Sequence, residues 1–199
     1  MPDPMSSKHQ LRQRFRRLRG AVSRDQRQSW TPEINRHLLA AHAVRNARTV
    51  AAFLAFDGEP DLRFTLTQLH RRGTTVVLPV LPKKSGDGEL EGQTLRFHRW
   101  SPATPLQSNT LGISEPSESA HVPLASVDVM LLPMVAYDRS GSRLGMGAGW
   151  YDRTLGNSNS RPLLAGVAWS LQCAPSVPID PWDVPLDAIV TEDGWFTCT

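Results

Sequence analysis

Residues 49–80 read TVAAFLAFDGEPDLRFTLTQLHRRGTTVVLPV, and their pattern decides the fold class. Residues 50–55 form a continuous apolar run, as do residues 74–78, and both runs have the length of strands. Between them, residues 61–72 have the pattern of a helix, which Gly73 ends. Strands that are apolar on both faces and joined by a helix are typical of a parallel sheet covered on both sides. The stretch therefore predicts an α/β protein.

The rest of the chain extends this sheet. Further apolar runs lie at residues 127–132, 163–169 and 188–190. Residues 83–92 are polar and rich in turn-forming types, and residues 94–100 alternate as an edge strand does, so we expect a β-hairpin excursion there. Residues 101–119 are rich in Pro and Ser and are expected to form a loop. The pattern predicts an open, mostly parallel sheet of five or six strands flanked by helices.

The first fifty residues are strongly basic, with 11 of the 22 Lys and Arg residues but only 3 of the 19 Asp and Glu residues. Leu11, Phe15 and Leu18 recur at helical spacing, and Ser23 followed by Gln26 has the form of a capping box, so we expect two amphipathic helices. A basic helix of this kind is a solvated face, a surface for phosphate or, less readily, a surface for nucleic acid. Composition does not decide between these interpretations.

Pro32 interrupts the second basic helix. Either Thr31 caps a new helix with Pro32 at its first position, or one helix continues and kinks at Pro32. Both arrangements satisfy the rules for proline in helices, and the sequence leaves the choice open.

The 199 residues suffice for one ordinary domain, and no long linker divides them. We expect a single domain over residues 1–199, with basic helices in residues 1–48 and the α/β core in residues 49–199. Cys173 and Cys198 have no metal-like or redox-like spacing, which indicates a reducing compartment. The start of the chain has no apolar segment and no run is long enough to cross a bilayer, so we expect a cytoplasmic protein without membrane contact.

Three glycines at alternate positions mark the chemically unusual part of the chain, residues 143–153, which read RLGMGAGWYDR. Gly145, Gly147 and Gly149 leave their backbone N–H groups free to approach a polyphosphate closely, and Arg143 and Arg153 flank them. A helix starting at residue 150 would add partial positive charge. As a bare pattern the glycines are equally typical of a tight turn, because neither the dinucleotide fingerprint nor the Lys-Ser/Thr ending of a Walker loop is present.

Asp152 lies next to this predicted phosphate site. A carboxylate beside phosphates is repelled by them unless a metal ion bridges the two, so Asp152 is a candidate Mg²⁺ ligand, directly or through water. The alternative is a capping or salt-bridging role with Arg153 or Arg143. The six histidines include no pair at metal-ligand spacing and are assigned no role.

The glycine segment resembles that of the 5-formyltetrahydrofolate cyclo-ligases, also called methenyltetrahydrofolate synthetases, whose signature is R-L-G-x-G-x-G-aromatic-Y-D-R. Further matching motifs, in the family's order, are the opening Lys8 to Arg12, Phe53-Leu54 leading to Glu59, Gly112 to Pro116, Asp128 to Pro133, and a tail of Gln172, Pro178, Asp183, Asp187 and Val190 to Glu192. Within this pattern, the family often has Gly where Ala148 stands, frequently Arg where Met146 stands and commonly Tyr where Trp150 stands. Of these, Ala148 matters most, because a β-carbon disfavours a positive φ.

The resemblance implies a Rossmann-like α/β fold and an ATP- and Mg²⁺-dependent reaction. In that reaction 5-formyltetrahydrofolate and ATP give 5,10-methenyltetrahydrofolate, ADP and phosphate, through phosphorylation of the formyl oxygen. Small molecules are then the partners, nucleic acid and membranes are not, and a monomer is expected.

The resemblance also implies roles for individual residues, carried over by position. The catalytic residues would be Lys8 and Arg143. The ATP-binding residues would be Lys8, Arg12, Arg143, Leu144, Gly145, Met146, Gly147, Ala148, Gly149, Trp150 and Tyr151. The substrate-binding residues would be Leu54, Glu59, Met146, Gly147, Ala148, Gly149 and Trp150. The metal ligands would be Asp152 and, less securely, Asp183, with Asp187 as its alternative.

Without the resemblance, each of these residues has an ordinary structural interpretation. Glu59 would be a surface turn residue, Leu54 a core residue, Lys8 a solvated residue near a terminus and Asp183 an exposed turn carboxylate. Two other functions compete: a nucleic-acid-binding protein that uses the basic helices, and a dinucleotide or sugar-phosphate enzyme. The second lacks an acidic ribose contact about twenty positions beyond the glycines, since residues 157–175 contain no Asp or Glu.

Overall fold

An eight-stranded sheet forms the centre of the computed structural model, which describes residues 7–82, 92–117 and 119–198. The strand order is β12-β11-β10-β7-β1-β2-β3-β6. The five parallel strands are β1 (Thr49–Ala51), β2 (Thr75–Val80), β7 (Val129–Pro133), β10 (Leu163–Val167) and β11 (Ala188–Thr191). The antiparallel additions are β3 (Arg96–Trp100) and β6 (His121–Val122) at one side and β12 (Gly194–Thr197) at the other. The expected α/β fold with a mostly parallel sheet is confirmed.

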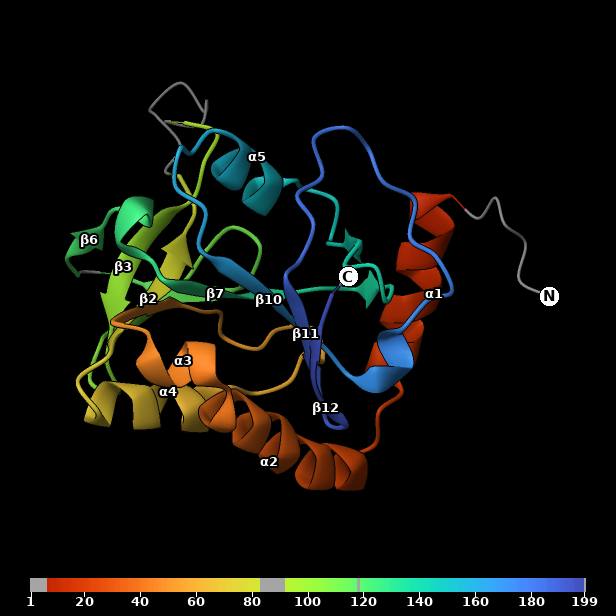
Figure 1. Ribbon diagram of the computed structural model, residues 1–199, viewed down its shortest axis with the longest axis horizontal. Coiled ribbons are helices and arrows are strands. Elements are labelled where there is room, and N and C mark those ends of the chain that lie inside the picture. Colours follow the sequence, from red (N-terminus) through yellow and green to blue (C-terminus); the bar gives the residue numbers. More distant parts are fainter. Residues whose placement is uncertain (1–6, 83–91, 118, 199) are drawn as a thin grey trace.

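Helices cover both faces of this sheet (Figure 1). On one face lie α2 (Arg24–Ala40), α3 (His42–Asn46) and α4 (Arg63–Arg71), and on the other lies α5 (Trp150–Gly156). The remaining helix, α1 (Lys8–Gly20), packs beside the small hairpin of β8 (Ala136–Tyr137) and β9 (Arg143–Leu144). The short 3-10 helices are η1 (Leu124–Ser126) and η2 (Ser170–Gln172).

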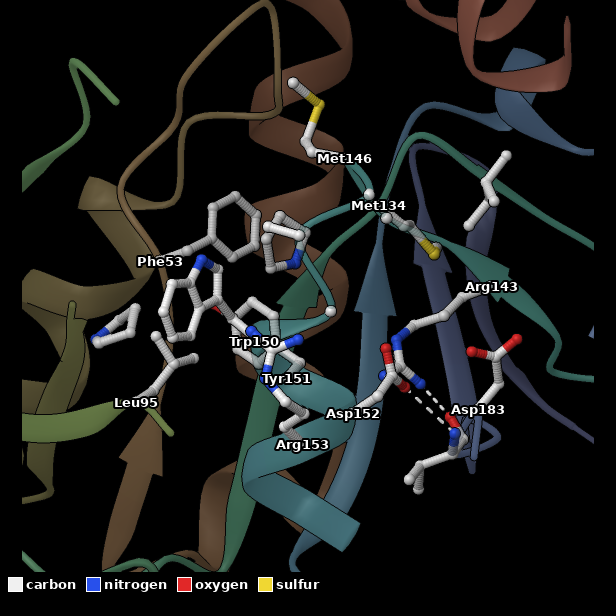
Figure 2. Close-up of a pocket in the computed structure, with 18 of the residues that line it drawn as sticks. Phe53, Leu95, Met134, Arg143, Met146, Trp150, Tyr151, Asp152, Arg153 and Asp183 are labelled. Atoms are coloured by element: carbon white, nitrogen blue, oxygen red, sulfur yellow. Dashed lines mark hydrogen bonds and ion pairs between the residues drawn. The ribbon is translucent and has the colours of Figure 1, made fainter. Parts of the chain in front are cut away.

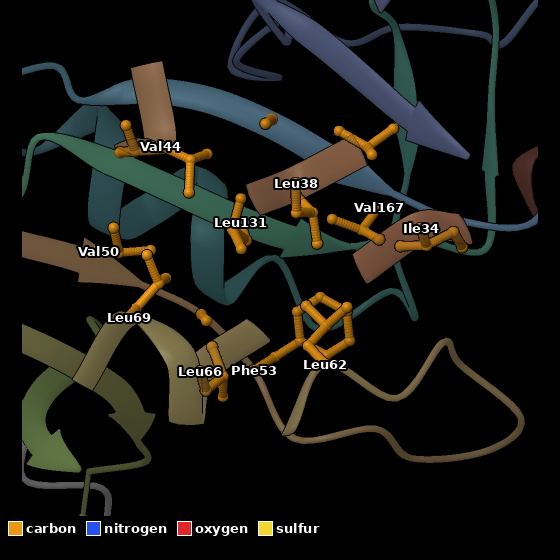
Figure 3. Packing of buried hydrophobic residues seen from close by; sticks show 14 of the residues in the cluster. Ile34, Leu38, Val44, Val50, Phe53, Leu62, Leu66, Leu69, Leu131 and Val167 are labelled. Atoms are coloured by element: carbon orange, nitrogen blue, oxygen red, sulfur yellow. The ribbon is translucent and has the colours of Figure 1, made fainter. Parts of the chain in front are cut away.

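The strands are buried on both faces because their apolar side chains alternate between two cores. Val50 and Leu131 pack with Ile34, Leu38 and other side chains of α2 and α4 on one face (Figure 3). Their chain neighbours Ala51 and Met130 belong to the core on the face of α5. Continuous apolar runs of this kind are what a doubly covered parallel sheet requires.

The two expected amphipathic helices are α1 and α2, and α2 begins directly after its predicted capping residue, Ser23. Ser23 accepts a hydrogen bond from the Gln26 N–H and Gln26 bonds back, which completes the predicted capping box of α2. Helix α2 runs through Pro32 without a break, so a new helix capped by Thr31 is wrong. The side-chain amide of Asn35 donates to the Thr31 carbonyl (2.8 Å) and to the Asp61 carbonyl (3.0 Å), and thereby ties α2 to the start of α4.

Several sheet boundaries differ from the expectation. The sheet has eight strands rather than five or six, because short edge strands such as β6 and β12 carry little apolar pattern. The antiparallel β2–β3 excursion is confirmed, but β3 is not an edge strand, since β6 covers its outer side. Strand β2 continues through Pro79. Proline has no N–H to donate, but β1 ends at Ala51, opposite Val77, so no hydrogen bond between β1 and β2 is lost at Pro79.

The stretch expected to be a loop, residues 101–119, contains a small antiparallel pair. Strands β4 (Leu106–Ser108) and β5 (Ser114–Pro116) form it, and Gly112 turns the chain between them with φ +76°. Most of the polar stretch predicted at residues 83–92 lies outside the described residues.

Helix α1 is seated on the rest of the protein by a separate apolar cluster. Leu11 and Phe15 from α1 pack against Ala136 and Leu144 of the β8–β9 hairpin, and Val177 completes the contact. The helix therefore lies against the segment that leads into the three glycines.

Candidate active site

A cavity of about 1190 Å³ opens at the carboxyl ends of the parallel strands, where ligands bind in open α/β sheets. Its walls come from α1, from the segment after β1, from the glycine segment and α5, from residues 109–114 and from residues 180–185. Every residue predicted to bind a ligand or to act in catalysis lines this one cavity: Lys8, Arg12, Leu54, Glu59, Arg143, Leu144, Gly145, Met146, Gly147, Ala148, Gly149, Trp150, Tyr151, Asp152 and Asp183. The alternative second metal ligand, Asp187, is not among the lining residues and instead pairs with Arg161 and the Leu164 N–H.

The β8–β9 hairpin presents the glycine segment to the cavity. Asp138 fixes the turn of this hairpin, since its carboxylate accepts hydrogen bonds from the N–H groups of Ser140 (3.0 Å), Ser142 (3.1 Å) and Val177 (2.8 Å). Arg12 holds the start of the glycine segment, because its Nε donates a hydrogen bond to the Gly145 carbonyl at 2.9 Å. The segment is thus supported from both sides before it reaches the open cavity.

Two of the three glycines adopt backbone angles that favour glycine. Gly147 has φ +107° and Gly149 has φ +66°. A β-carbon on Gly149 would also lie 2.9 Å from Nη1 of Arg153. Ala148 between them is not in the left-handed region, where Asp57 is the one non-glycine residue of the described chain. The departure from the family pattern at Ala148 therefore introduces no backbone strain.

Arg143 and Asp152 form a partly buried ion pair beneath the glycine segment (Figure 2). Nη2 of Arg143 lies 2.5 Å from Oδ1 of Asp152, and Nη1 donates to the Val184 carbonyl. The same Asp152 oxygen accepts the Val184 N–H at 3.2 Å. The pair thereby joins the glycine segment to residues 180–185 across the cavity.

Lys8 makes the second cationic contact of the cavity. Its Nζ donates to Oδ2 of Asp180 at 2.7 Å and to Oδ2 of Asp183 at 2.5 Å. Burial acts to lower the pKa of Lys8, but the hydrogen bonds and charges of the two carboxylates outweigh it and raise the pKa. Burial likewise acts to raise the pKa of Asp183, and the contacts with Lys8 and with the Asp180 N–H lower it overall. Both partners are therefore charged at neutral pH.

Glu59 is a buried carboxylate in the cavity wall. Its Oε2 accepts the Phe56 N–H at 3.0 Å, and its Oε1 accepts from Nη1 of Arg19 at 3.3 Å. Burial raises the pKa of Glu59 to about 7, because the charge of Arg19 offsets the loss of solvation only in part. Tyr151 lies near it, and burial together with the Glu59 charge raises the pKa of the Tyr151 phenol.

The cavity has a polar side and an apolar side. Figure 2 shows Arg143, Asp152 and Asp183 together on one side, and Phe53, Leu95 and Trp150 gathered on the other. Cζ of Arg153 lies 4.8 Å from the centroid of the Trp150 ring, which holds the indole by a cation–π contact. A ligand with an anionic part and a flat aromatic part matches both sides.

Sequence reasoning missed two residues of the cavity wall, Asp180 and Trp182, and one residue behind it, Arg19. Asp180 shares Lys8 with Asp183, and Trp182, with 69% of its surface exposed, stands in the wall. Arg19 is fully buried behind Glu59. Its place in an arginine-rich helix concealed it, although Arg19 follows Leu11 and Phe15 at the same spacing of four residues.

The described residues contain no group of three or more His, Cys, Asp or Glu side chains that could hold a metal ion. Asp152 and Asp183 are paired instead with Arg143 and Lys8. Across the same part of the chain, the helices are all too short or too polar to span a bilayer.

Comparison with known proteins identifies the family. The model of the 5-formyltetrahydrofolate cyclo-ligase family matches residues 4–192. The chain is 38% identical over 181 residues to the 5-formyltetrahydrofolate cyclo-ligase of Escherichia coli (strain K12), which covers 89% of this chain and 96% of the relative. It is 33% identical over 182 residues to the enzyme of the same name from Haemophilus influenzae, with coverages of 90% and 94%.

Solved structures agree with this assignment. The structure of 5,10-methenyltetrahydrofolate synthetase from Aquifex aeolicus superimposes with a TM-score of 0.80 at 31% identity, covering 96% of this chain and 92% of that one. A synthetase structure from Mycoplasma pneumoniae, at 23% identity and a TM-score of 0.75, shares the fold. The chain belongs to the 5-formyltetrahydrofolate cyclo-ligase family and is therefore an enzyme of the ligase class.

Proposed function

We propose that this protein converts 5-formyltetrahydrofolate and ATP into 5,10-methenyltetrahydrofolate, ADP and phosphate, with Mg²⁺ as the metal ion. The observation that carries the proposal is the single cavity in which the glycine segment, the cationic side chains of Lys8, Arg12 and Arg143, and a buried carboxylate meet. At about 1190 Å³ this cavity exceeds the usual size of a site for one small ligand, and it has room for two. Family membership supports the choice of the two substrates.

The polar side of the cavity suits the triphosphate of ATP. Backbone N–H groups from Gly145 to Tyr151 can donate hydrogen bonds to phosphate oxygens, because Gly147 and Gly149 bring no side chain between them and the ligand. Lys8, Arg12 and Arg143 add positive charge at the same side. Transfer of a phosphoryl group depends mainly on positioning and on charge neutralisation, which these groups provide.

The donor types at the cavity fit Mg²⁺. This ion is usually held by one or two carboxylates together with phosphate oxygens and water, and Asp152 and Asp183 are carboxylates in the wall beside the proposed phosphate site. Both carboxylates are held by cationic side chains, which can turn toward the phosphates when the nucleotide binds. When bound, Mg²⁺ neutralises charge on the phosphates.

The apolar side suits the folate. Trp150 offers a flat ring on which a pterin can stack, and Leu54 and Met146 contribute apolar contacts nearby. Glu59, when ionised, accepts hydrogen bonds from the N–H donors of the pterin. The Glu59 side chain is 8% exposed, and a hydrogen bond to a carboxylate in so weakly solvated a position is stronger than one in water.

The chemistry explains why ATP is consumed. The formyl carbon of the substrate is a poor electrophile, and its oxygen is a poor leaving group. The formyl oxygen attacks the γ-phosphorus, and ADP leaves with the electrons of the broken P–O bond. N10 then attacks the formyl carbon, its proton is released, and inorganic phosphate leaves with the former formyl oxygen. Lys8 and Arg143 stabilise the charge on the migrating phosphoryl group.

Two measurements test the proposal. The protein is mixed with 5-formyltetrahydrofolate, ATP and Mg²⁺, and the near-ultraviolet absorbance of the methenyl product is followed, with each component omitted in turn. We expect product only in the complete mixture. Substrate labelled with ¹⁸O in the formyl group should transfer the label to the released phosphate. Product formation without ATP, or unlabelled phosphate, would refute the proposed route.

A further inference from the structure

Arg19, near the end of α1, is a charged residue with no exposed surface. Its Nη1 lies 3.3 Å from Oε1 of Glu59 and 3.3 Å from the Met134 carbonyl. Its Nη2 lies 2.7 Å from Oδ2 of Asp57 and 3.7 Å from the sulfur of Met146. Nε has no acceptor among the described residues, so the two terminal nitrogens make all of these contacts. A single guanidinium thus touches the segment after β1, the segment after β7 and the glycine segment.

Arg19 does not line the cavity, whereas Glu59 does. Any effect of Arg19 on a ligand must therefore pass through the residues that it holds. Of those, Glu59 is the one whose charge is proposed to meet the folate. The Phe56 N–H fixes one oxygen of Glu59 and Arg19 fixes the other, so the plane of the carboxylate is set from two sides.

The turn that carries Glu59 also depends on Arg19. Asp57 has φ +49°, in the left-handed region that residues other than glycine adopt less often. Its carboxylate is held by Arg19 and, at 2.9 Å, by Nε of Arg16. These two ion pairs stabilise the strained turn two residues before Glu59.

We propose that Arg19 is a positioning residue that aligns Glu59 as an ionised acceptor for the pterin of the folate substrate. The inference rests on the proposed function, in which Glu59 contacts the pterin. Arg19 would then affect affinity for the folate from outside the cavity, through Glu59, without changing affinity for ATP.

The groups that face Glu59 have opposing effects on its ionisation. Arg19 approaches from α1, Asp57 belongs to the same turn, and the Tyr151 phenol approaches from α5. Arg19 is the one cation in this set, and it counteracts both burial and the charge of Asp57. Without Arg19 the pKa of Glu59 rises above its present value of about 7, and the carboxyl is protonated at neutral pH. A protonated carboxyl loses part of its capacity to accept hydrogen bonds.

The chain offers a matched control. Arg16 stands one turn earlier on the same helix and contacts the same Asp57 oxygen, but it does not contact Glu59 and its side chain is 49% exposed. Arg19→Gln and Arg16→Gln each remove one charge and one bond to Asp57. Only Arg19→Gln leaves Glu59 without its ion partner.

The experiment measures steady-state kinetics and folate binding for both variants over a range of pH. For Arg19→Gln we expect KM for 5-formyltetrahydrofolate at pH 7 to rise at least about tenfold, with KM for ATP within about twofold of the parent. The acid limb of the folate kcat/KM profile should move to higher pH, so that high pH restores much of the loss. Arg16→Gln, which weakens the turn but keeps the bond between Arg19 and Glu59, should raise KM for the folate far less than Arg19→Gln and should leave the acid limb at the pH of the parent. Equal effects of the two substitutions, or an unmoved acid limb, would overturn the inference.

A double substitution separates positioning from general loss of structure. If Arg19 acts through Glu59, then adding Arg19→Gln to Glu59→Gln lowers folate affinity little further, whereas an independent structural role gives additive losses. Arg19→Lys keeps a positive charge beside Glu59 but has one terminal nitrogen in place of two. It covers the case in which Arg19→Gln fails to fold: its acid limb should stay near that of the parent, and a large shift of that limb would contradict the inference. Failure of the parent protein itself to bind the folate would instead refute the proposed function.

Discussion

Nζ of Lys8 lies 2.5 Å from Oδ2 of Asp183, 175 positions further along the chain. Arg143 and Asp152 make an equivalent pair. Each proposed catalytic cation is therefore bonded to one proposed metal ligand. In the proposed reaction, a nucleotide that binds with Mg²⁺ would open both pairs, so that the cations turn toward the phosphates and the carboxylates toward the metal ion.

Lys8→Gln is expected to raise the dissociation constant for ATP by at least about tenfold, since one charge-assisted contact to phosphate is lost. The measurement is calorimetric titration with Mg²⁺ and ATP in the absence of folate. Arg14→Gln, an exposed position on the same helix, is the control and should leave the constant unchanged. Equal affinities of Lys8→Gln and the parent would remove Lys8 from the ATP site.

Arg143→Ala is expected to lower turnover at least tenfold, because a charge-assisted bond to phosphate is worth roughly 1.5–3 kcal/mol. Turnover is measured on protein whose folded state has been verified by circular dichroism. The control Arg36→Ala removes an exposed arginine that pairs with Glu33 on α2. Unchanged turnover in folded Arg143→Ala would place Arg143 outside the reaction.

Asp152→Asn is expected to raise the Mg²⁺ concentration needed for half-maximal turnover several-fold, because an amide is a weaker ligand for a hard cation than a carboxylate. The check is a Mg²⁺ titration at fixed ATP, accompanied by a Mg²⁺ titration of ATP binding. Identical titration curves for variant and parent would leave Asp152 with a structural role alone, as the partner of Arg143.

Glu59→Gln is expected to change how stability depends on pH. Folding raises the pKa of Glu59 from 4.5 to about 7, so between these values the folded state holds a proton that the unfolded state lacks. This group therefore makes the protein less stable as pH rises through that window. Urea denaturation at several pH values should show the variant gaining stability relative to the parent from pH 4.5 to pH 7. A constant difference across the window would contradict the raised pKa.

Substitutions at two neighbouring positions of the glycine segment, Ala148 and Gly149, are expected to have different effects because, of the two, only Gly149 has a positive φ. Ala148→Gly should leave turnover within about twofold, because Ala148 already has an unstrained backbone. Gly149→Ala should lower stability by about 1–2 kcal/mol, the cost of a side chain in the left-handed region, and should lower turnover as well. Thermal denaturation and turnover of both variants test this contrast. Equal behaviour of the two variants would show that the segment changes conformation in solution.

Sequence reasoning predicted the parts of this fold that a strong local pattern specifies. The apolar runs at 50–55, 127–132 and 163–169 led to β1, β7 and β10, and the glycine segment marked the cavity wall. It failed where tertiary contacts decide. Strand β12 forms by pairing with β11 and has too little apolar pattern to be recognised alone.

The same limit applies to the site. All of the ligand-contact residues carried over by resemblance line one cavity, because the motifs that define them are local strings of sequence. Arg19 and Asp180 were missed, since their partners Glu59 and Lys8 are distant along the chain. Burial of one arginine among many depends on how α1 is seated on the β8–β9 hairpin. The spacing of Leu11 and Phe15 indicates the face that is seated but not the partners that bury Arg19.

The packing of α1 on the β8–β9 hairpin determines which substitutions are expected to affect both substrate sites at once. Helix α1 carries Lys8 and Arg12 in the wall of the proposed nucleotide site and Arg19 against the carboxylate proposed to meet the pterin. Of its side chains, Leu11 and Phe15 alone belong to the apolar cluster beneath it. Truncating Phe15 would touch neither ligand, yet it would let the whole helix shift. Affinities for both substrates would then decline in parallel, whereas the loss of a single contact residue such as Glu59 is expected to weaken the folate alone.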